Sequence, residues 1–211
     1  YMFNLMFSSL IVVALVVFGH YSIAGELGLV TSFWITVTQI FSSNLRSIIV
    51  SENKIEYAIS TLFYRIFTSV IFYAFAYIII LNFISFENKD LIILFSLLIL
   101  VQWINEMSLV KSEIRQKALI FKIYSAVNFV TLFLSIFCLY FSLFSYLQYI
   151  FFTYILFIII SIIFNYFKFK EGNFNINLKS IYQLNIRTIA FLSSFSIVIS
   201  SFAWRMMIYF T

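Results

Sequence analysis

Polar side chains recur at helical spacing in residues 31–49, TSFWITVTQIFSSNLRSII, a segment that is otherwise apolar enough to enter a membrane. At 100° per residue these side chains occupy an arc of about 100°. The Arg46 guanidinium can hold a phosphate through two parallel hydrogen bonds, and hydroxyl and amide groups can bind hydroxylated ligands. The opposite side carries Phe33, Ile40 and Leu45, so the pattern predicts one hydrated face and one lipid-facing side. The polar members of the arc are Ser32, Thr36, Gln39, Ser43, Arg46 and Ser47.

Four further apolar segments each carry a short polar stripe. Several helices with one polar face each predict a bundle around a hydrated cavity. The alternative is that the hydroxyls bond to carbonyls of their own helix or join two helices, and that Arg46 only anchors its span at the membrane surface. The stripes are Thr61, Arg65 and Thr68; Gln102, Asn105 and Glu106; Ser125, Asn128, Thr131 and Ser135; and Ser193, Ser196 and Ser200 followed by Arg205.

The charges expected at membrane depth are unbalanced. Arg46, Arg65 and Arg205 face one candidate acidic partner, Glu106. A charge at the bilayer centre costs about 2.5–3.5 kcal/mol on insertion scales, so it faces a partner or water. An excess of Arg in a confined space attracts an anion, and a lipid-linked sugar phosphate supplies both negative charge and hydroxyl groups. The candidate substrate-binding residues are Thr36, Gln39, Asn44, Arg46, Arg65, Gln102, Glu106, Asn128, Thr131 and Arg205.

Residues for covalent, acid–base or metal chemistry are scarce. The chain has one cysteine, Cys138 in an apolar run, and one histidine, His20. We therefore expect no disulfide, no metal site and no cofactor. The connections opposite the basic ones are short, and only Glu26, Glu87 and Asp90 there could serve as catalytic acids. Glu87 and Asp90 are better explained as part of a solvated loop. We expect no catalytic residues, no enzyme activity and no nucleic-acid partner.

Composition places these residues in a membrane protein. The 211 residues are 64% hydrophobic and 10% charged, whereas soluble domains are about half apolar and a quarter charged. A bilayer span needs about 20 apolar residues, and its backbone must bond internally. The fold class predicted is therefore an all-α, polytopic membrane helix bundle of about seven transmembrane helices. The expected spans are 2–19, 28–50, 58–82, 91–109, 118–141, 146–167 and 186–210.

Lysine and arginine placement predicts the orientation. Of the 13 basic residues, 11 lie in or beside the connections after the second, fourth and sixth spans. The opposite connections hold only Lys89, and Arg205 lies within the last span. Because basic residues collect on the cytoplasmic side, the N-terminus is predicted to be cytoplasmic.

Both ends of the sequence look cut, because the first residue is Tyr1 and not a methionine and the last, Thr211, follows directly on an apolar run. We expect a fragment of a longer protein. The predicted organisation is an N-terminal transmembrane lobe of about six helices over 1–185, followed over 186–211 by the first helix of a second, truncated lobe.

Three segments together resemble a known family. The sequence AGELGLVTSFWITVTQIFSSNLRSIIVSENK is similar to the first-loop and second-span region of polysaccharide (O-antigen type) flippases, with the family's glycine turn reduced to Gly25-Glu26-Leu27-Gly28. VQWINEMSLVKSEIRQKA resembles the end of the fourth span and its basic loop, and SSFAWRMMIYF the seventh span. This family belongs to the multidrug/oligosaccharidyl-lipid/polysaccharide exporter superfamily.

The resemblance implies a function. It implies a multi-pass transporter of the bacterial inner membrane that flips a polyprenyl-pyrophosphate-linked oligosaccharide for polysaccharide or O-antigen biosynthesis. It also implies that Arg46, Arg65 and Arg205 engage the pyrophosphate, that two lobes rock around the site, and that a polysaccharide polymerase is a possible partner. Membrane lipids are the other expected contacts.

Three alternatives are open. A membrane enzyme of polysaccharide assembly, such as a polymerase, glycosyltransferase or acyltransferase, needs a general base or a metal-binding acid at the membrane face. A multidrug-type exporter is disfavoured by the first span, which has no acidic residue to bind a coupling ion. A scaffold without transport predicts a dry bundle.

Overall fold

A computed structural model describes residues 2–42, 45–51, 53, 56–83, 88–115 and 118–170. Within these residues the chain forms eight α-helices and no strand. The helices are α1 (Met2–Val17), α2 (Tyr21–Ser42), α3 (Leu45–Ser51), α4 (Glu56–Phe83), α5 (Lys89–Ser108), α6 (Val110–Ile114), α7 (Ala118–Tyr140) and α8 (Phe144–Lys170).

The all-α membrane bundle is supported by helix length and composition. Four helices are long and apolar enough to cross a membrane, namely Tyr57–Ile78, Lys89–Ser108, Leu119–Tyr140 and Phe144–Phe167. A shorter apolar helix covers Phe7–Val17. The count of about seven spans and the cytoplasmic N-terminus stay predictions. The seventh expected span, the second lobe and Arg205 lie outside the described residues.

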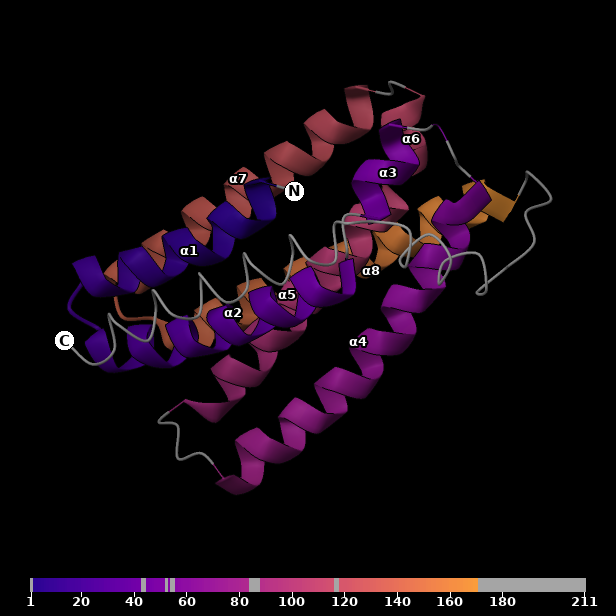
Figure 1. The fold of residues 1–211 in the computed structure, drawn as a ribbon. Coiled ribbons are helices and arrows are strands. Elements are labelled where there is room, and N and C mark those ends of the chain that lie inside the picture. The colour runs from indigo at the N-terminus through magenta and orange to yellow at the C-terminus, as the bar shows by residue number, and fades with distance from the viewer. Residues whose placement is uncertain are drawn as a thin grey trace.

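Helix α5 is the centre of the bundle. It packs against α1, α2, α4 and α8, while α7 completes the surround by packing on α1 and α8 (Figure 1). Its buried residues lie on all sides of the helix, including Leu91, Phe95, Leu98 and Met107. Residues 91–101 of α5 are apolar on nearly every side, and a helical segment with this pattern is expected to be buried.

Helices α7 and α8 turn large apolar side chains outward. Phe133 and Phe137 on α7 are 64% and 51% exposed, and Phe164 on α8 is 58% exposed. Such exposure would be unfavourable in water but suits contact with lipid chains. The apolar surface therefore agrees with a membrane-embedded protein.

The structure describes the predicted second span, 28–50, in two parts, α2 up to Ser42 and α3 from Leu45. Residues 43 and 44 between them lie outside the described residues, so the single span stays a prediction. The polar arc of this segment is distributed over both parts. Phe33 is 43% exposed, as expected, but Leu45, expected to face lipid, is 1% exposed because α3 packs against α4 and α6.

The glycine segment expected to form a turn is helical instead. Gly25 and Gly28 lie inside α2, which begins at Tyr21. Each glycine lowers helix propensity by about 1 kcal/mol, and packing of α1 on α2 outweighs this cost. A Cβ at Gly28 would lie 3.8 Å from Val12 Cγ1, an ordinary van der Waals distance, so the contact between α1 and α2 leaves room for alanine there.

Two similar turns join α1 to α2 and α7 to α8. Gly19 has a φ of +82° and Ser142 a φ of +56°. In each turn the chain makes a paired hydrogen-bond pattern, with His20 N bonded to Leu15 O at 2.9 Å and Leu143 N bonded to Cys138 O at 2.8 Å. The pattern is that of a Schellman cap. Ser142 Oγ lies 3.3 Å from His20 Nε2, so both turns lie at the same end of the bundle.

Candidate functional site

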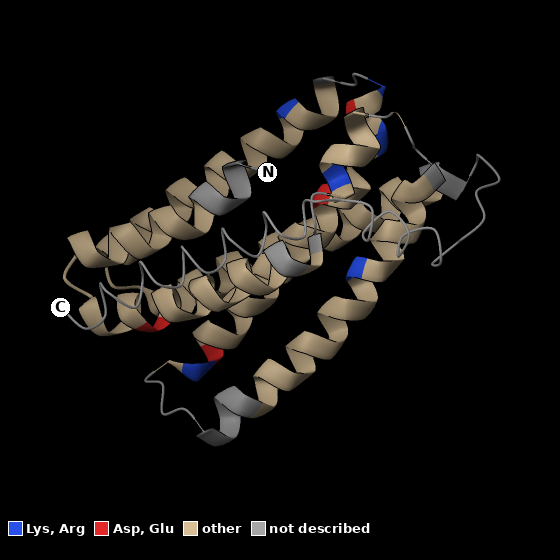
Figure 2. Cartoon of the chain, viewed as in Figure 1, with Lys and Arg blue, Asp and Glu red and all other residues tan. Residues whose placement is uncertain are grey.

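A cavity of about 700 Å³ opens between α3, the C-terminal end of α5 and the first half of α7. It lies at the end of the bundle where α3, α6 and the start of α7 gather the Lys and Arg residues, opposite the first turn of α5 (Figure 2). This polar end of an otherwise apolar bundle is the candidate site. The lining residues are Arg46, Glu106, Leu109, Phe121, Lys122, Tyr124, Ser125, Ala126, Asn128 and Phe129.

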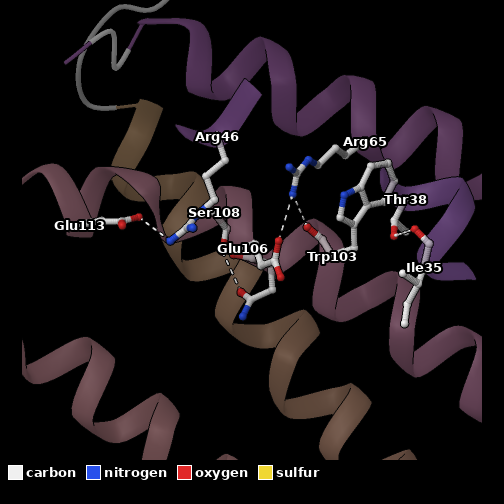
Figure 3. Close-up of polar contacts among 9 residues, drawn as sticks. Ile35, Thr38, Arg46, Arg65, Trp103, Glu106, Ser108 and Glu113 are labelled. Carbon is white, nitrogen blue, oxygen red and sulfur yellow. Dashed lines mark hydrogen bonds and ion pairs between the residues drawn. The ribbon is translucent and has the colours of Figure 1, made fainter. Parts of the chain in front are cut away.

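Arg46 reaches the cavity from α3 and is held by α6. Its Nη2 lies 2.6 Å from Glu113 Oε2, with the two side chains 23% and 32% exposed (Figure 3). The Arg46 Nε is buried and has no hydrogen-bond partner among the described residues. The guanidinium therefore keeps donor capacity for an anion while one of its nitrogens is occupied.

Arg65 lies deeper, between α4 and α5, and is 1% exposed. Its Nη1 donates a 2.6 Å hydrogen bond to the Trp103 carbonyl oxygen and lies 3.6 Å from Glu106 Oε2 (Figure 3). The guanidinium carbon stands 4.9 Å from the Trp103 ring centroid. The expected pairing of Glu106 with a membrane arginine is confirmed for Arg65. Arg65 itself does not line the cavity, so the structure does not bring it together with Arg46 there.

Buried polar groups continue from the cavity into the bundle between α5, α7 and α8. The Tyr124 hydroxyl lies beside Asn105, Asn128 and Tyr154, and Tyr154 lies beside Gln102. Several of their atoms are buried yet have no hydrogen-bond partner among the described residues. We call these five residues the Asn128 cluster. The atoms are Gln102 Nε2, Asn105 Nδ2, Tyr124 Oη, Tyr154 Oη and both amide atoms of Asn128.

Next to the cluster, other polar groups are satisfied within the protein. Ser108 Oγ donates to the Asn105 side-chain oxygen at 2.8 Å. Asn165 Nδ2 on α8 reaches Ser108 Oγ and Ser161 Oγ, each at 3.4 Å. These contacts join α5 to α8.

The hydroxyls of the predicted stripes mostly serve their own helices. Ser32 Oγ on α2 donates to Gly28 O, four residues earlier, at 2.7 Å. Thr131 Oγ1 on α7 donates to Val127 O at 2.8 Å, and Ser135 Oγ to Thr131 O at 2.8 Å. For these residues the helix-bonding alternative describes the structure better than a cavity lining.

The structure places the remaining predicted residues as follows. Thr36 is half-buried on α2 and does not line the cavity. Gln102 is 2% exposed and Asn128 is 3% exposed, and both belong to the Asn128 cluster. The Gln39 side chain and the whole of Asn44 lie outside the described residues.

Three residues at or beside the cavity are not among the predicted site residues. Lys122 contributes to the predicted orientation, and in the structure it also lines the cavity and pairs with no acid among the described residues. Tyr124 lies four residues before Asn128 and therefore on the same helix face, which is the one sequence signal for it. Glu113, the partner of Arg46, lies on α6, and no feature of the sequence links it to α3.

Within the described residues, no group of three His, Cys, Asp or Glu side chains is placed to hold a metal ion. Cys138 is a buried free thiol on α7. Comparisons of the chain with protein-family models, curated proteins and solved structures find no match. The cavity and its side chains therefore carry the functional inference by themselves.

Proposed function

We propose that the protein is a transporter that flips a polyprenyl-pyrophosphate-linked oligosaccharide across the bacterial inner membrane for polysaccharide or O-antigen assembly. One observation carries the proposal: a cavity at one end of an apolar helix bundle joins two cationic side chains to a set of buried, unsatisfied polar groups. A polysaccharide polymerase is a possible partner, since it would use the translocated product.

The cationic side of the cavity suits a phosphate group. Arg46 and Lys122 line it, and Glu106, the acid in the lining, is paired with Arg65. A guanidinium binds phosphate oxygens bidentately, and an ammonium adds a mobile point charge. The local balance of charge therefore favours an anion over a cation.

The size of the cavity matches a headgroup rather than a whole lipid. Small-molecule sites occupy about 300–1,000 Å³, and this cavity measures about 700 Å³. A polyprenyl chain would stay in the bilayer, against outward-facing rings such as Phe129, which lines the cavity and is 66% exposed. The charged and hydroxylated part alone would enter the protein.

Reconstitution tests the proposal. The full chain is placed in proteoliposomes with a fluorescent polyprenyl-pyrophosphate disaccharide, and transfer between leaflets is followed with a membrane-impermeant quencher. We expect protein-dependent transfer that falls about tenfold in Arg46→Gln, because a charge-assisted contact to the phosphate is lost. Lys89→Gln, at the other end of α5, is the matched control and should transfer at the wild-type rate.

Two results would contradict the proposal. Transfer no faster than in empty liposomes would exclude transport of this lipid. Release or lengthening of the saccharide would instead identify a membrane enzyme of polysaccharide assembly.

A further inference from the structure

The Asn128 cluster holds more unsatisfied bonding capacity than a helix interface needs. Asn105 is fully buried, and Gln102, Asn128 and Tyr154 are 2%, 3% and 3% exposed. Nevertheless six of the cluster's side-chain atoms make no hydrogen bond of good geometry to the described residues, although the Tyr124 hydroxyl lies beside Asn105, Asn128 and Tyr154. Leaving a buried polar group unpaired costs about 1–3 kcal/mol, and such groups in native proteins are normally bonded to protein or to a bound molecule.

The position of the cluster indicates a ligand rather than a packing defect. Two members of the cluster, Tyr124 and Asn128, line the cavity together with Glu106, and the other three members lie behind them, so the cluster connects to an accessible space. Just outside it, the Asn105–Ser108–Asn165 contacts show that this part of the bundle can satisfy polar groups internally. The unsatisfied groups are those around Tyr124 and Asn128, the two members at the cavity, and their neighbours Gln102, Asn105 and Tyr154.

The chemistry of the open groups defines the ligand class. Gln102 Nε2 and Asn105 Nδ2 are donors, Asn128 offers one donor and one acceptor, and the two tyrosine hydroxyls can act as either. No member of the cluster carries a charge. A carboxamide with both atoms free can bind two adjacent hydroxyls of a sugar, donating to one and accepting from the other.

We infer that the Asn128 cluster binds the hydroxyls of the sugar next to the pyrophosphate, so that the saccharide enters the bundle first and the pyrophosphate stays at the mouth with Arg46 and Lys122. This inference rests on the proposed function and specifies how its substrate is oriented. Sugar recognition then belongs to α5, α7 and α8, and phosphate recognition to α3 and the first turns of α7.

Comparing the affinity for the bare lipid with the affinity for the glycosylated lipid distinguishes binding of the pyrophosphate from binding of the sugar. The full chain in nanodiscs is titrated with bare polyprenyl pyrophosphate and with the same lipid carrying glucose, galactose or N-acetylglucosamine. In the wild-type protein we expect at least one glycosylated lipid to bind about tenfold more tightly, the gain from a few added hydrogen bonds. Asn128→Leu should remove this gain and leave the affinity for the bare lipid within about twofold of wild type, since no charge changes.

Controls separate binding from folding. Ser135→Ala lies on the same face of α7, where its hydroxyl donates to a carbonyl of its own helix, and should keep the gain. Asn128→Leu should unfold at or above the wild-type temperature, because it removes an unpaired buried amide. If it does not fold, Tyr124→Phe, which deletes one hydroxyl, takes its place and should reduce the gain.

The outcomes are distinct. Equal affinities for all four lipids in the wild-type protein would overturn the inference and leave the proposed function intact. A gain that persists in both Asn128→Leu and Tyr124→Phe would show that the cluster holds only water, and would also overturn it. Failure to bind even the bare lipid would count against the proposed function, and the inference would fall with it.

Discussion

Arg65 and Glu106 show how an ion pair is tolerated among membrane helices. Both are buried, and the arginine is also held by the Trp103 carbonyl oxygen and ring. A buried pair gains little over an apolar pair of similar volume, because desolvation offsets the attraction. Removing one partner is costly, since a charge is then left unbalanced. The pair therefore fixes how α4 meets α5 more than it stabilises the bundle.

A double-mutant cycle tests this view of the pair. We expect Arg65→Met alone to lower the free energy of unfolding by about 3–5 kcal/mol, because Glu106 is stranded. Arg65→Met with Glu106→Leu should return to within about 1 kcal/mol of wild type. Denaturant unfolding in detergent measures both. Additive losses in the double variant would contradict the idea of a compensated pair.

The candidate residues fall into two groups, those whose polar atoms bond to their own helix and those whose polar atoms do not. Thr131 and Ser32 looked like cavity residues from spacing alone, but their hydroxyls bond to carbonyls of their own helices. Asn128 has no such local option, because neither of its amide atoms finds a partner among the described residues. The periodicity of the sequence shows which face of a helix is polar. A polar residue indicates a ligand only when its side chain is not already hydrogen-bonded to its own helix.

At the scale of elements, the turns that follow α1 and α7 differ in their contribution to stability. The chain uses the same cap after α1 and after α7, once with Gly19 and once with Ser142 in the left-handed region. A residue with a Cβ pays about 1–2 kcal/mol there, whereas glycine does not. The second turn is therefore the weaker of the two.

Substitutions at the left-handed residues of these two turns should change the free energy of unfolding in opposite directions. Ser142→Gly is expected to raise the free energy of unfolding by about 1 kcal/mol, and Gly19→Ala to lower it by about as much. Thermal unfolding in detergent gives both values. A loss on Ser142→Gly would instead mean that the 3.3 Å contact between Ser142 and His20 outweighs backbone strain.

At the scale of the whole molecule, the bundle has one polar end, at the C-terminal end of α5, and an apolar body. The described basic residues on α3, α6 and α7 gather at one end, and the turns at Gly19 and Ser142 lie together (Figure 2). In an up-and-down bundle, successive connections lie at opposite ends. The cavity then opens toward the basic side, which is predicted to be cytoplasmic.

Thiol labelling tests both the orientation and the hydration of the cavity. In a Cys138→Ser background, single cysteines are placed at Ser125, Ser142 and Phe33, and a membrane-impermeant reagent is added from each side. We expect Ser125→Cys to react from the cytoplasm and Ser142→Cys from the opposite side. Phe33→Cys should stay silent, because it faces lipid. Reaction of the first two from the reverse sides would invert the orientation, and silence at 125 would mean a dry cavity.

The sequence by itself determined the membrane class, the apolar helices and the polar faces of α4, α5 and α7, because length, composition and period act locally. It also pointed to Glu106 as an arginine partner. Only the tertiary structure decided that Leu45 is buried, that Arg46 pairs with Glu113, and that Tyr124 and Lys122 join Asn128 at the cavity. These outcomes depend on which helices become neighbours, and contacts between residues far apart in the chain leave no periodic trace in a single sequence.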